Sequence, residues 1–222
     1  MMRTLTDGIK AVIFDFDGTF YASHGIKRRL MFSCISSLVY LKGDREFRRM
    51  NRGRDFGSSE GFYEEYCRFI GPKAKQWKDN VFMPAMIKVL KRYKARKDTS
   101  SVLNVLKSAG IKIVVFSDYN RVEERMEAIG LSRDLVSSVY DSESLGLLKP
   151  CPRGLMNISR DLNVDPKEIL VVGDRADTDG EGAIKCGMKF IKIGKMENEL
   201  NEKDITVLSW EQFLSNIIGS ND

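Results

Sequence analysis

The sequence predicts an α/β protein with a doubly wound parallel sheet, into which an all-helical domain is inserted after the first strand. Short apolar runs without polar alternation recur along the chain and predict strands that are buried on both faces. Amphipathic helical patterns separate most of these runs, an order typical of a parallel sheet covered on both sides by helices. The alternation is interrupted once, between residues 20 and 98, where no strand-like run occurs.

Six apolar runs are the predicted strands: KAVIF (10–14), IKIVVF (111–116), VSSVY (136–140), EILVVG (168–173), MKFIKI (188–193) and ITVL (205–208). The helical patterns between them end at residues that commonly stop helices, namely Gly110, Gly130 and the Asp165-Pro166 turn. The interrupted stretch holds helical patterns of its own, among them residues 58–71 and 83–97. We therefore predict a core domain of residues 1–19 and 99–222 and a helical cap domain of residues 20–98.

The composition is that of a soluble globular protein. Apolar residues make up 42% of the chain and charged residues 30%, and no apolar run approaches the roughly 18 residues that a membrane span needs. The first ten residues, MMRTLTDGIK, lack the apolar segment of a secretory signal. We expect a cytoplasmic protein without a membrane partner.

Cysteine and histidine usage narrows the chemistry. The four cysteines, at positions 34, 67, 151 and 186, are widely separated, and His24 is the single histidine. This pattern favours idle or buried thiols over a zinc cluster or a disulfide framework. One histidine also argues against a histidine-dependent phosphatase, a HExxH metalloprotease and a Ser-His-Asp hydrolase. Catalysis, if present, must depend on carboxylates.

The formal net charge of +5 conceals an asymmetry between the two parts of the chain. Residues 20–98 carry a formal charge of +11, which leaves −6 for the rest. Solvated helix faces would explain the basic residues, and so would attraction of an anionic ligand. The segment RRMNRGR (48–54) has few interleaved aromatic residues, so we do not expect a nucleic acid partner.

Polar residues follow three of the predicted strands directly. Asp15 follows the first strand, Ser117 the second and Asp174 the fourth. Ligands of doubly wound sheets bind at the carboxyl ends of the strands, so these side chains are expected to meet at one edge. Carboxylates gathered there would repel each other unless a cation lay between them, and oxygen ligands favour Mg²⁺.

Mg²⁺ prefers sites where a substrate phosphate completes its coordination shell. The turn amides at Gly18 and Thr19 can donate to phosphate oxygens, the hydroxyls of Thr19 and Ser117 can add further hydrogen bonds, and Lys149 supplies positive charge. Each residue also has a simpler explanation as a turn former, helix cap or surface lysine. Their joint occurrence, in this order and at strand ends, favours a phosphate site.

The chain resembles the haloacid dehalogenase-like (HAD) hydrolase superfamily. Four motifs carry the resemblance: DFDGT (15–19), VVFSD (114–118), the lysine of LKPCP (148–152) and GDRADTDGEGA (173–183). The similarity covers residues 10–20 and 99–218, and the helical insert is similar to the cap of phosphoglycolate phosphatase and its relatives.

The resemblance implies a role for each matching residue. Asp15 would be the nucleophile that becomes an aspartyl phosphate, and Asp17 the general acid and base. Asp15, the main-chain carbonyl of Asp17 and Asp174 would hold Mg²⁺, while Ser117 and Lys149 would bind the transferring phosphoryl group.

The fourth motif departs from the family pattern. The second aspartate of the family stands four residues after the first, and Thr178 occupies that position here. Asp179 keeps the usual distance to Gly182, so we assume a one-residue insertion and choose Asp179 as the supporting carboxylate, with Asp177 as the alternative. Gly180 stands where the family commonly has an apolar residue.

Asp17 favours phosphoester chemistry, because dehalogenases of the superfamily lack an aspartate two residues after the nucleophile. We predict a Mg²⁺-dependent phosphatase acting on a small phosphorylated metabolite. A phosphomutase, a phosphonatase and a non-catalytic module that binds a phospho-ligand or partner remain alternatives. A second anionic group on the substrate would explain a basic cap. Candidates for contacting the non-reacting part of the substrate are Tyr21, His24 and the arginines at positions 28, 29, 45, 48, 49, 52 and 54.

Overall fold

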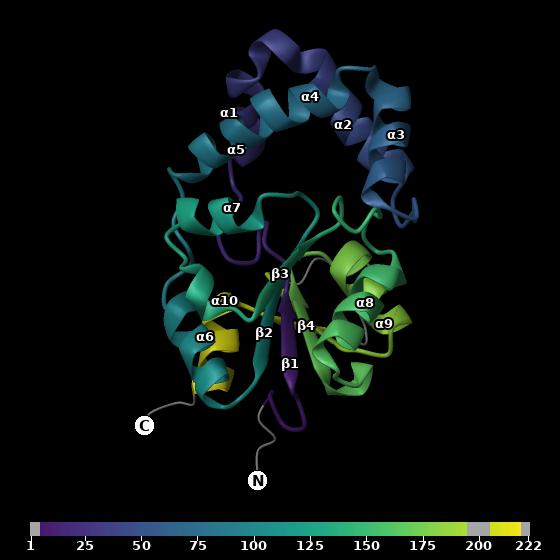
Figure 1. Ribbon diagram of the computed structural model, residues 1–222. Helices are drawn as coiled ribbons and strands as arrows, with labels where there is room; N and C mark the ends of the chain where they lie inside the picture. The colour runs from purple at the N-terminus through teal and green to yellow at the C-terminus, as the bar shows by residue number, and fades with distance from the viewer. Residues whose placement is uncertain (1–4, 195–204, 219–222) are drawn as a thin grey trace.

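The computed structural model describes residues 5–194 and 205–218, and its centre is a six-stranded parallel sheet (Figure 1). The strands lie in the order β3-β2-β1-β4-β5-β6. Each predicted strand forms, with bounds shifted by one or two residues: β1 Ala11–Phe14, β2 Lys112–Ser117, β3 Ser138–Asp141, β4 Ile169–Gly173, β5 Lys189–Ile193 and β6 Thr206–Leu208. The predicted doubly wound α/β fold is confirmed.

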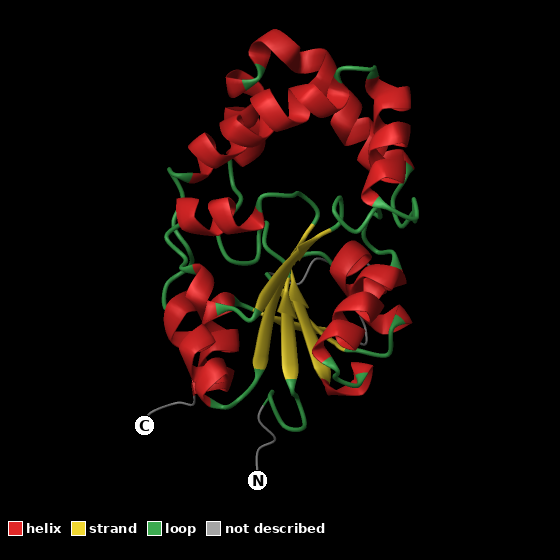
Figure 2. Cartoon of the chain, in the orientation of Figure 1, coloured by secondary structure: helices red, strands yellow, loops and turns green. Residues whose placement is uncertain are grey.

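Alternating side chains of β1 explain why helices cover both faces of the sheet. Val12 and Phe14 point into one apolar cluster, and Ala11 and Ile13 point into another. The first cluster is closed by α6 (Thr99–Ser108) and α10 (Trp210–Ile218), and the second by α8 (Pro152–Leu162) and α9 (Glu181–Lys185), as Figure 2 shows. A further core helix, α7 (Val122–Ala128), follows β2.

A helical segment connects β1 to β2 and arches over the carboxyl ends of the strands (Figure 1). Its helices are α1 Ile26–Ser33, α2 Leu38–Met50, α3 Ser59–Ile70, α4 Ala74–Trp77 and α5 Met83–Leu90. We call residues 20–98 the helical insert. The predicted core domain also contains residues 1–4, 195–204 and 219–222, which lie outside the described part of the chain. Within the described residues, no helix has the length and apolar character that crossing a bilayer requires.

The helix predicted over residues 83–97 is shorter than expected, because α5 ends at Leu90. The chain beyond it returns to the core, where the amide of Ala95 donates to the carbonyl of Ile129 and the amide of Arg96 donates to the carbonyl of Phe20. These hydrogen bonds replace the helical ones. The basic residues that follow α5 therefore belong to a linker and not to a helix.

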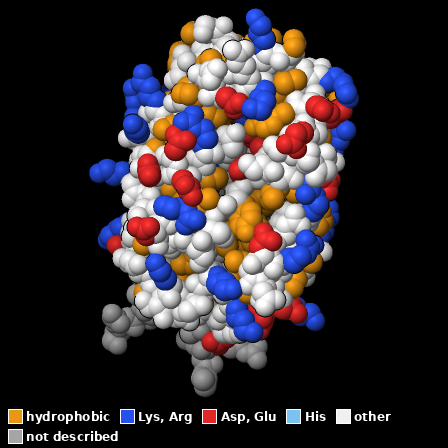
Figure 3. All heavy atoms as spheres, viewed as in Figure 1, with side chains coloured by type: hydrophobic (Ala, Val, Ile, Leu, Met, Phe, Trp, Pro, Cys, Tyr) orange, Lys and Arg blue, Asp and Glu red, His pale blue; other side chains and the backbone are white. Residues whose placement is uncertain are grey.

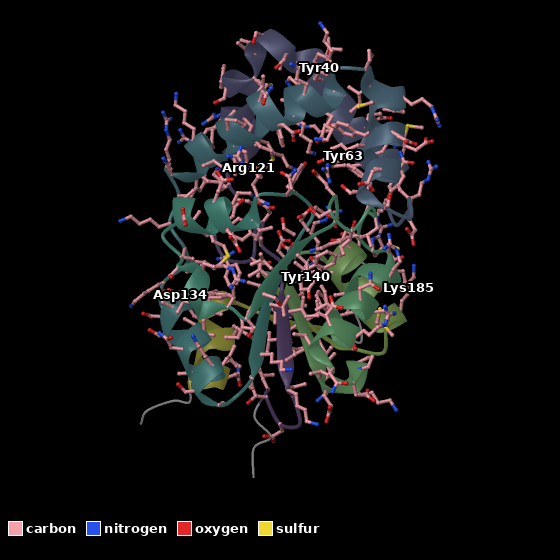
Figure 4. All side chains as sticks on the ribbon, viewed as in Figure 1. Tyr40, Tyr63, Arg121, Asp134, Tyr140 and Lys185 are labelled. Atoms are coloured by element: carbon pink, nitrogen blue, oxygen red, sulfur yellow. The ribbon has the colours of Figure 1, made fainter. Side chains whose placement is uncertain are left out.

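A buried group of charged side chains joins the helical insert to the core. Lys78, which is fully buried, lies 2.6 Å from Glu143 and 3.3 Å from Asp44. Arg48 pairs with both carboxylates, and the hydroxyl of Tyr63 donates to Glu143 at 2.7 Å. In Figure 4, Tyr63 lies on the inner side of the arch. Glu143 belongs to the loop after β3, so these ion pairs connect the helical insert to the core domain.

Asp44 makes the folded state sensitive to acid. Burial alone would raise its pKa, but Lys78, Arg48 and the hydrogen bond from Tyr66 outweigh burial and lower the pKa from 3.8 to about 2. The resulting stabilisation is present above pH 3.8 and is lost as the pH falls towards 2. We expect Asp44→Asn to remove this pH-dependent part, on the order of 2 kcal/mol. Urea unfolding of the wild type and of Asp44→Asn at pH 7, 5, 4 and 3 measures this contribution. A difference in the free energy of unfolding that stays constant across this range would contradict the prediction.

Candidate active site

Asp15 lies directly after β1, between the ends of the two strands that flank it. Its amide donates to the carbonyl of Val172 at 2.8 Å, which continues the parallel ladder and fixes the start of the turn. One carboxylate oxygen accepts a hydrogen bond from Lys149 at 2.8 Å, and the other accepts one from the Thr19 hydroxyl at 3.2 Å. The side chain is 9% exposed. A buried carboxylate is thus held at the carboxyl edge of the sheet in a defined orientation.

Lys149 neutralises part of this charge. Its ammonium group donates to Asp15, to Asp179 at 2.9 Å and to the carbonyl of Phe116 at 2.7 Å. Burial lowers the pKa of Lys149, but the two carboxylates outweigh burial and raise the pKa above its usual value. The lysine therefore stays charged.

A third carboxylate nevertheless lies beside this pair. Asp15, Asp174 and Asp179 each offer an oxygen within 4.8 Å of the others. Burial raises the pKa of Asp15 well above its usual range, with Asp179 and Asp174 adding to the rise that Lys149 opposes. Burial and Asp179 raise the pKa of Asp174 to about 7. A divalent cation would stabilise all three in their ionised form, and an all-oxygen donor set suits Mg²⁺, so the residues fit the predicted metal.

Gly18 allows the first motif to approach this cluster. Its φ of +88° lies in the region that favours glycine, and a Cβ atom there would fall 2.0 Å from a carboxylate oxygen of Asp174. Any side chain at position 18 would therefore displace Asp174. The close approach brings the turn after β1 against the loop after β4.

The register of the fourth motif is explained by a π-helical turn. Residues Ala176–Gly180 form one π-helical turn before α9, the local structure that a single inserted residue produces in a helix. It turns Asp179 inward to Lys149 and leaves Asp177 at the surface, where Asp177 pairs with Arg175. Gly180 packs against the ring of Phe190, which a Cβ atom would meet at 2.7 Å.

This arrangement predicts different results for two neighbouring aspartates. Asp179→Asn removes a carboxylate that contacts Lys149 and belongs to the three-carboxylate cluster, so we expect kcat/KM to fall at least about 10²-fold. Asp177→Asn is the matched control and should change kcat/KM less than about threefold, because its carboxylate is 55% exposed. Steady-state kinetics of both variants at several Mg²⁺ concentrations test this, and equal losses would contradict it.

Asp17 lies in a separate set of contacts, beside Ser117. One of its oxygens accepts a hydrogen bond from the hydroxyl of Tyr21, and the other is bound by Arg125 and lies 3.4 Å from the Ser117 hydroxyl. Burial would raise the pKa of Asp17, but Arg125 and the hydrogen bonds from Arg125 and Tyr21 outweigh burial and lower it. The side chain of Asp17 does not belong to the three-carboxylate cluster.

No sequence pattern singles out Arg125. It occupies α7, and its side chain is fully buried. It donates to the Ser117 hydroxyl at 2.8 Å, to the carbonyl of Tyr119 at 2.9 Å and to Asp17, and it lies over the ring of Phe16. One guanidinium thus orients both Asp17 and Ser117.

Arg96 supports the first motif from the linker after α5. Its guanidinium donates to the carbonyl of Thr19 at 2.8 Å and to the carbonyl of Gly18 at 2.9 Å. This role could not be predicted from the sequence. Arg96 lies in a run of basic residues, and no spacing distinguishes it from its neighbours.

A cavity of about 690 Å³ lies between the helical insert and the strand ends. Asp15, Asp17, Asp174, Asp179 and Lys149 line its core side. Tyr21 and the arginines at positions 45, 48, 49 and 52 also line it, whereas His24 and the arginines at positions 28, 29 and 54 do not. The structure therefore brings together the predicted carboxylates, Lys149 and about half of the predicted cap residues.

Comparisons with known proteins agree with this architecture. The haloacid dehalogenase-like hydrolase family matches residues 9–187. A glyceraldehyde 3-phosphate phosphatase of Methanopyrus kandleri is 27% identical over 218 residues, which cover 91% of this chain and 92% of that protein. A phosphoglycolate phosphatase of Neisseria gonorrhoeae is 30% identical over 112 residues, which cover 49% of this chain and 47% of that protein.

The crystal structure of a HAD phosphatase from Thermococcus onnurineus has the same fold, with a TM-score of 0.65 at 21% identity. The similarity covers 95% of this chain and 98% of that one, including the helical insert. Motifs, fold and family match lead to one conclusion: this protein belongs to the haloacid dehalogenase-like hydrolase family.

Proposed function

We propose that this protein is a Mg²⁺-dependent phosphatase that hydrolyses a small phosphorylated metabolite through an aspartyl phosphate on Asp15. The observation that carries the proposal is the setting of Asp15, a buried carboxylate clamped by Lys149 and Thr19 at the floor of a cavity beside two further carboxylates. The relatives named as phosphatases of three-carbon and two-carbon phosphates support the choice of reaction and the small size of the substrate.

In the first step, Lys149 and the amides of the turn at Gly18 and Thr19 hold the phosphoryl group against Asp15. A carboxylate oxygen of Asp15 forms a bond to phosphorus while the ester P–O bond breaks. The leaving oxygen takes a proton from Asp17, which must be protonated for this step although Arg125 and Tyr21 lower its pKa. Positioning and charge neutralisation provide most of the catalysis in such transfers, which suits a site made of fixed charges.

In the second step, Asp17 takes a proton from a water molecule, and the water oxygen attacks phosphorus. The Asp15–phosphorus bond breaks, inorganic phosphate leaves and the Asp15 carboxylate is restored. Asp17 must separate from Arg125 in part to reach the leaving oxygen, because both of its oxygens already accept hydrogen bonds. We assign Ser117 to the phosphoryl group as well, which requires its hydroxyl to turn from Asp17.

Asp15, Asp174 and Asp179 are the side chains that would hold Mg²⁺, together with the main-chain carbonyl of Asp17. When bound, the ion offsets the negative charge of the phosphoryl oxygens and of the carboxylates.

The test is Mg²⁺-dependent phosphate release from a panel of phosphorylated metabolites, with the wild type beside Asp15→Asn. The panel includes glyceraldehyde 3-phosphate, phosphoglycolate, an aldehyde phosphonate and a hexose 1-phosphate, so that phosphonatase and mutase reactions are detected by their products. We expect phosphate release by the wild type alone, and none without Mg²⁺. Phosphate release that survives Asp15→Asn would overturn the proposal, and tight phosphate binding without turnover would favour a binding module.

A further inference from the structure

Single faces of two helices form much of the insert side of the cavity. From α1, Ile26, Lys27 and Leu30 line it. From α2 and the turn after it, residues 41, 44, 45, 48, 49 and 52 line it, at alternating spacings of three and one. These spacings mark one side of an α-helix. The basic residues within these sets therefore face the substrate space, whereas other basic residues of the same helices do not.

Basic residues outnumber acidic ones among the cavity-lining residues other than the reacting groups. Apart from Lys149 and the four aspartates of the reaction site, six basic and three acidic residues of the described chain line it. On the outer face shown in Figure 3, by contrast, basic and acidic side chains are interspersed over both the insert and the core.

Four of these six basic residues already have partners. Arg48 pairs with Asp44 and Glu143, and Arg49 pairs with Glu46. Arg52 donates to Glu181, and Arg175 pairs with Asp177. The partners hold these side chains in place and offset their charge.

The side chains of the other two basic residues, Lys27 on α1 and Arg45 on α2, have no hydrogen bond or ion pair with any residue in 5–194 or 205–218. Two such cations in the lining of one cavity can attract an anion. Arginine offers a planar fork that matches a carboxylate or phosphate, and lysine adds a mobile point charge.

Apolar side chains also line the cavity. Leu30, Leu41, Phe82 and Met86 are among them. A carbon skeleton can pack against them while its two ends meet charged groups. The cavity volume of about 690 Å³ leaves room for a group beyond the phosphoryl group being transferred.

We propose that Lys27 and Arg45 bind a second anionic group, a carboxylate or another phosphate, at the far end of the substrate. The preferred substrates are then phosphomonoesters with two anionic ends joined by a short carbon skeleton. This inference rests on the proposed phosphatase function and deepens it. Neutral phosphomonoesters are turned over by the same reacting groups but lack the second contact, so their kcat/KM is lower.

The test compares ester pairs that differ at the far end alone. In the first pair, 3-phosphoglycerate carries a carboxylate where glycerol 3-phosphate carries a hydroxymethyl group; in the second, fructose 1,6-bisphosphate carries a phosphate that fructose 6-phosphate lacks. We expect the wild type to favour the anionic member of at least one pair at least tenfold in kcat/KM. The pair that shows this preference identifies the anion as carboxylate or phosphate.

The double variant Lys27→Ala/Arg45→Ala should reduce this ratio at least tenfold. The matched control is Lys42→Ala/Lys88→Ala, which removes two exposed charges from α2 and α5 outside the cavity and should leave the ratio within twofold. Neither lysine side chain pairs with a residue in the described part of the chain. Raising the KCl concentration should lower the wild-type ratio, a readout that needs no variant.

A wild-type ratio near one in both pairs, or a ratio retained by the double variant, would overturn the inference while leaving the phosphatase intact. Absence of Asp15-dependent turnover of all four esters would overturn the proposed function and this inference with it.

Discussion

Lys149→Met is expected to abolish measurable phosphatase activity and to destabilise the fold. The variant leaves the buried carboxylates of Asp15 and Asp179 without their shared cation. Removing one partner of a buried ion pair typically costs about 3–5 kcal/mol, because the remaining charge is uncompensated. We expect kcat to fall at least about 10³-fold, since the phosphoryl group also loses its fixed positive charge. Phosphate release and urea unfolding measure the two effects.

Lys185→Met is the matched control for this substitution. Lys185 lies at the edge of α9 (Figure 4), and its side chain is 51% exposed beside Glu181. An exposed ion pair of this kind contributes little to stability. We therefore expect Lys185→Met to change the free energy of unfolding by less than about 0.5 kcal/mol and to release phosphate at the wild-type rate. If Lys149→Met were as stable and as active as Lys185→Met, the role given to Lys149 would be wrong.

Arg125→Leu is expected to lower kcat about 10²-fold while KM changes little. The substitution removes the guanidinium that orients Asp17 and Ser117, and a misplacement of about 1 Å at a reacting group costs a loss of this size. If Arg125 only stabilised the fold, Arg125→Leu would lower the stability of the protein but would not lower kcat selectively at a nearly constant KM. Measuring kcat, KM and the thermal midpoint of unfolding together distinguishes the two.

Arg125→Lys and Arg121→Leu are the companion variants. Arg125→Lys keeps the charge and should recover part of the activity. Arg121 lies just before the same helix but pairs with Glu124, and its side chain is 33% exposed, so Arg121→Leu should retain full activity. Equal kcat values for Arg125→Leu and the wild type would show that the reaction does not depend on orientation of Asp17 and Ser117 by Arg125.

The sheet could be predicted from the sequence because its central strands, β1, β2 and β4, are buried on both faces. Runs such as IKIVVF show no regular polar alternation, which is typical of strands in a parallel sheet. The end of α5 could not be predicted in the same way. The run from Lys91 to Lys97 is compatible with a helix, and hydrogen bonds to residues distant in sequence, such as that from Arg96 to Phe20, decide otherwise.

The reaction site was predictable where residues follow strands directly. Asp15 and Asp174 are placed by β1 and β4, so their convergence follows from the order of the sheet. The side chain of Asp17 instead turns to Arg125, a contact between segments 108 residues apart that no local pattern encodes.

The insert was predicted as a basic helical region. Its composition does not tell which of its basic residues line the cavity. The distinction between Arg45, which lines the cavity, and Arg28, which does not, depends on helix faces and on how the arch sits over the sheet. The alternating spacing of cavity-lining positions along α2 is a signal that the sequence contains. It becomes interpretable once one of these positions is known to face the site.

The most direct test of the account is to identify the phosphorylated residue during turnover. Asp17→Asn should slow hydrolysis of the intermediate, and p-nitrophenyl phosphate supplies a leaving group that needs little protonation, so the covalent intermediate should accumulate. After rapid acid quenching and tryptic digestion, we predict a phosphoryl group on Asp15 within the peptide of residues 11–27, in a Mg²⁺-dependent amount. A phosphoryl group on another residue, or turnover without any covalent intermediate, would contradict the central claim.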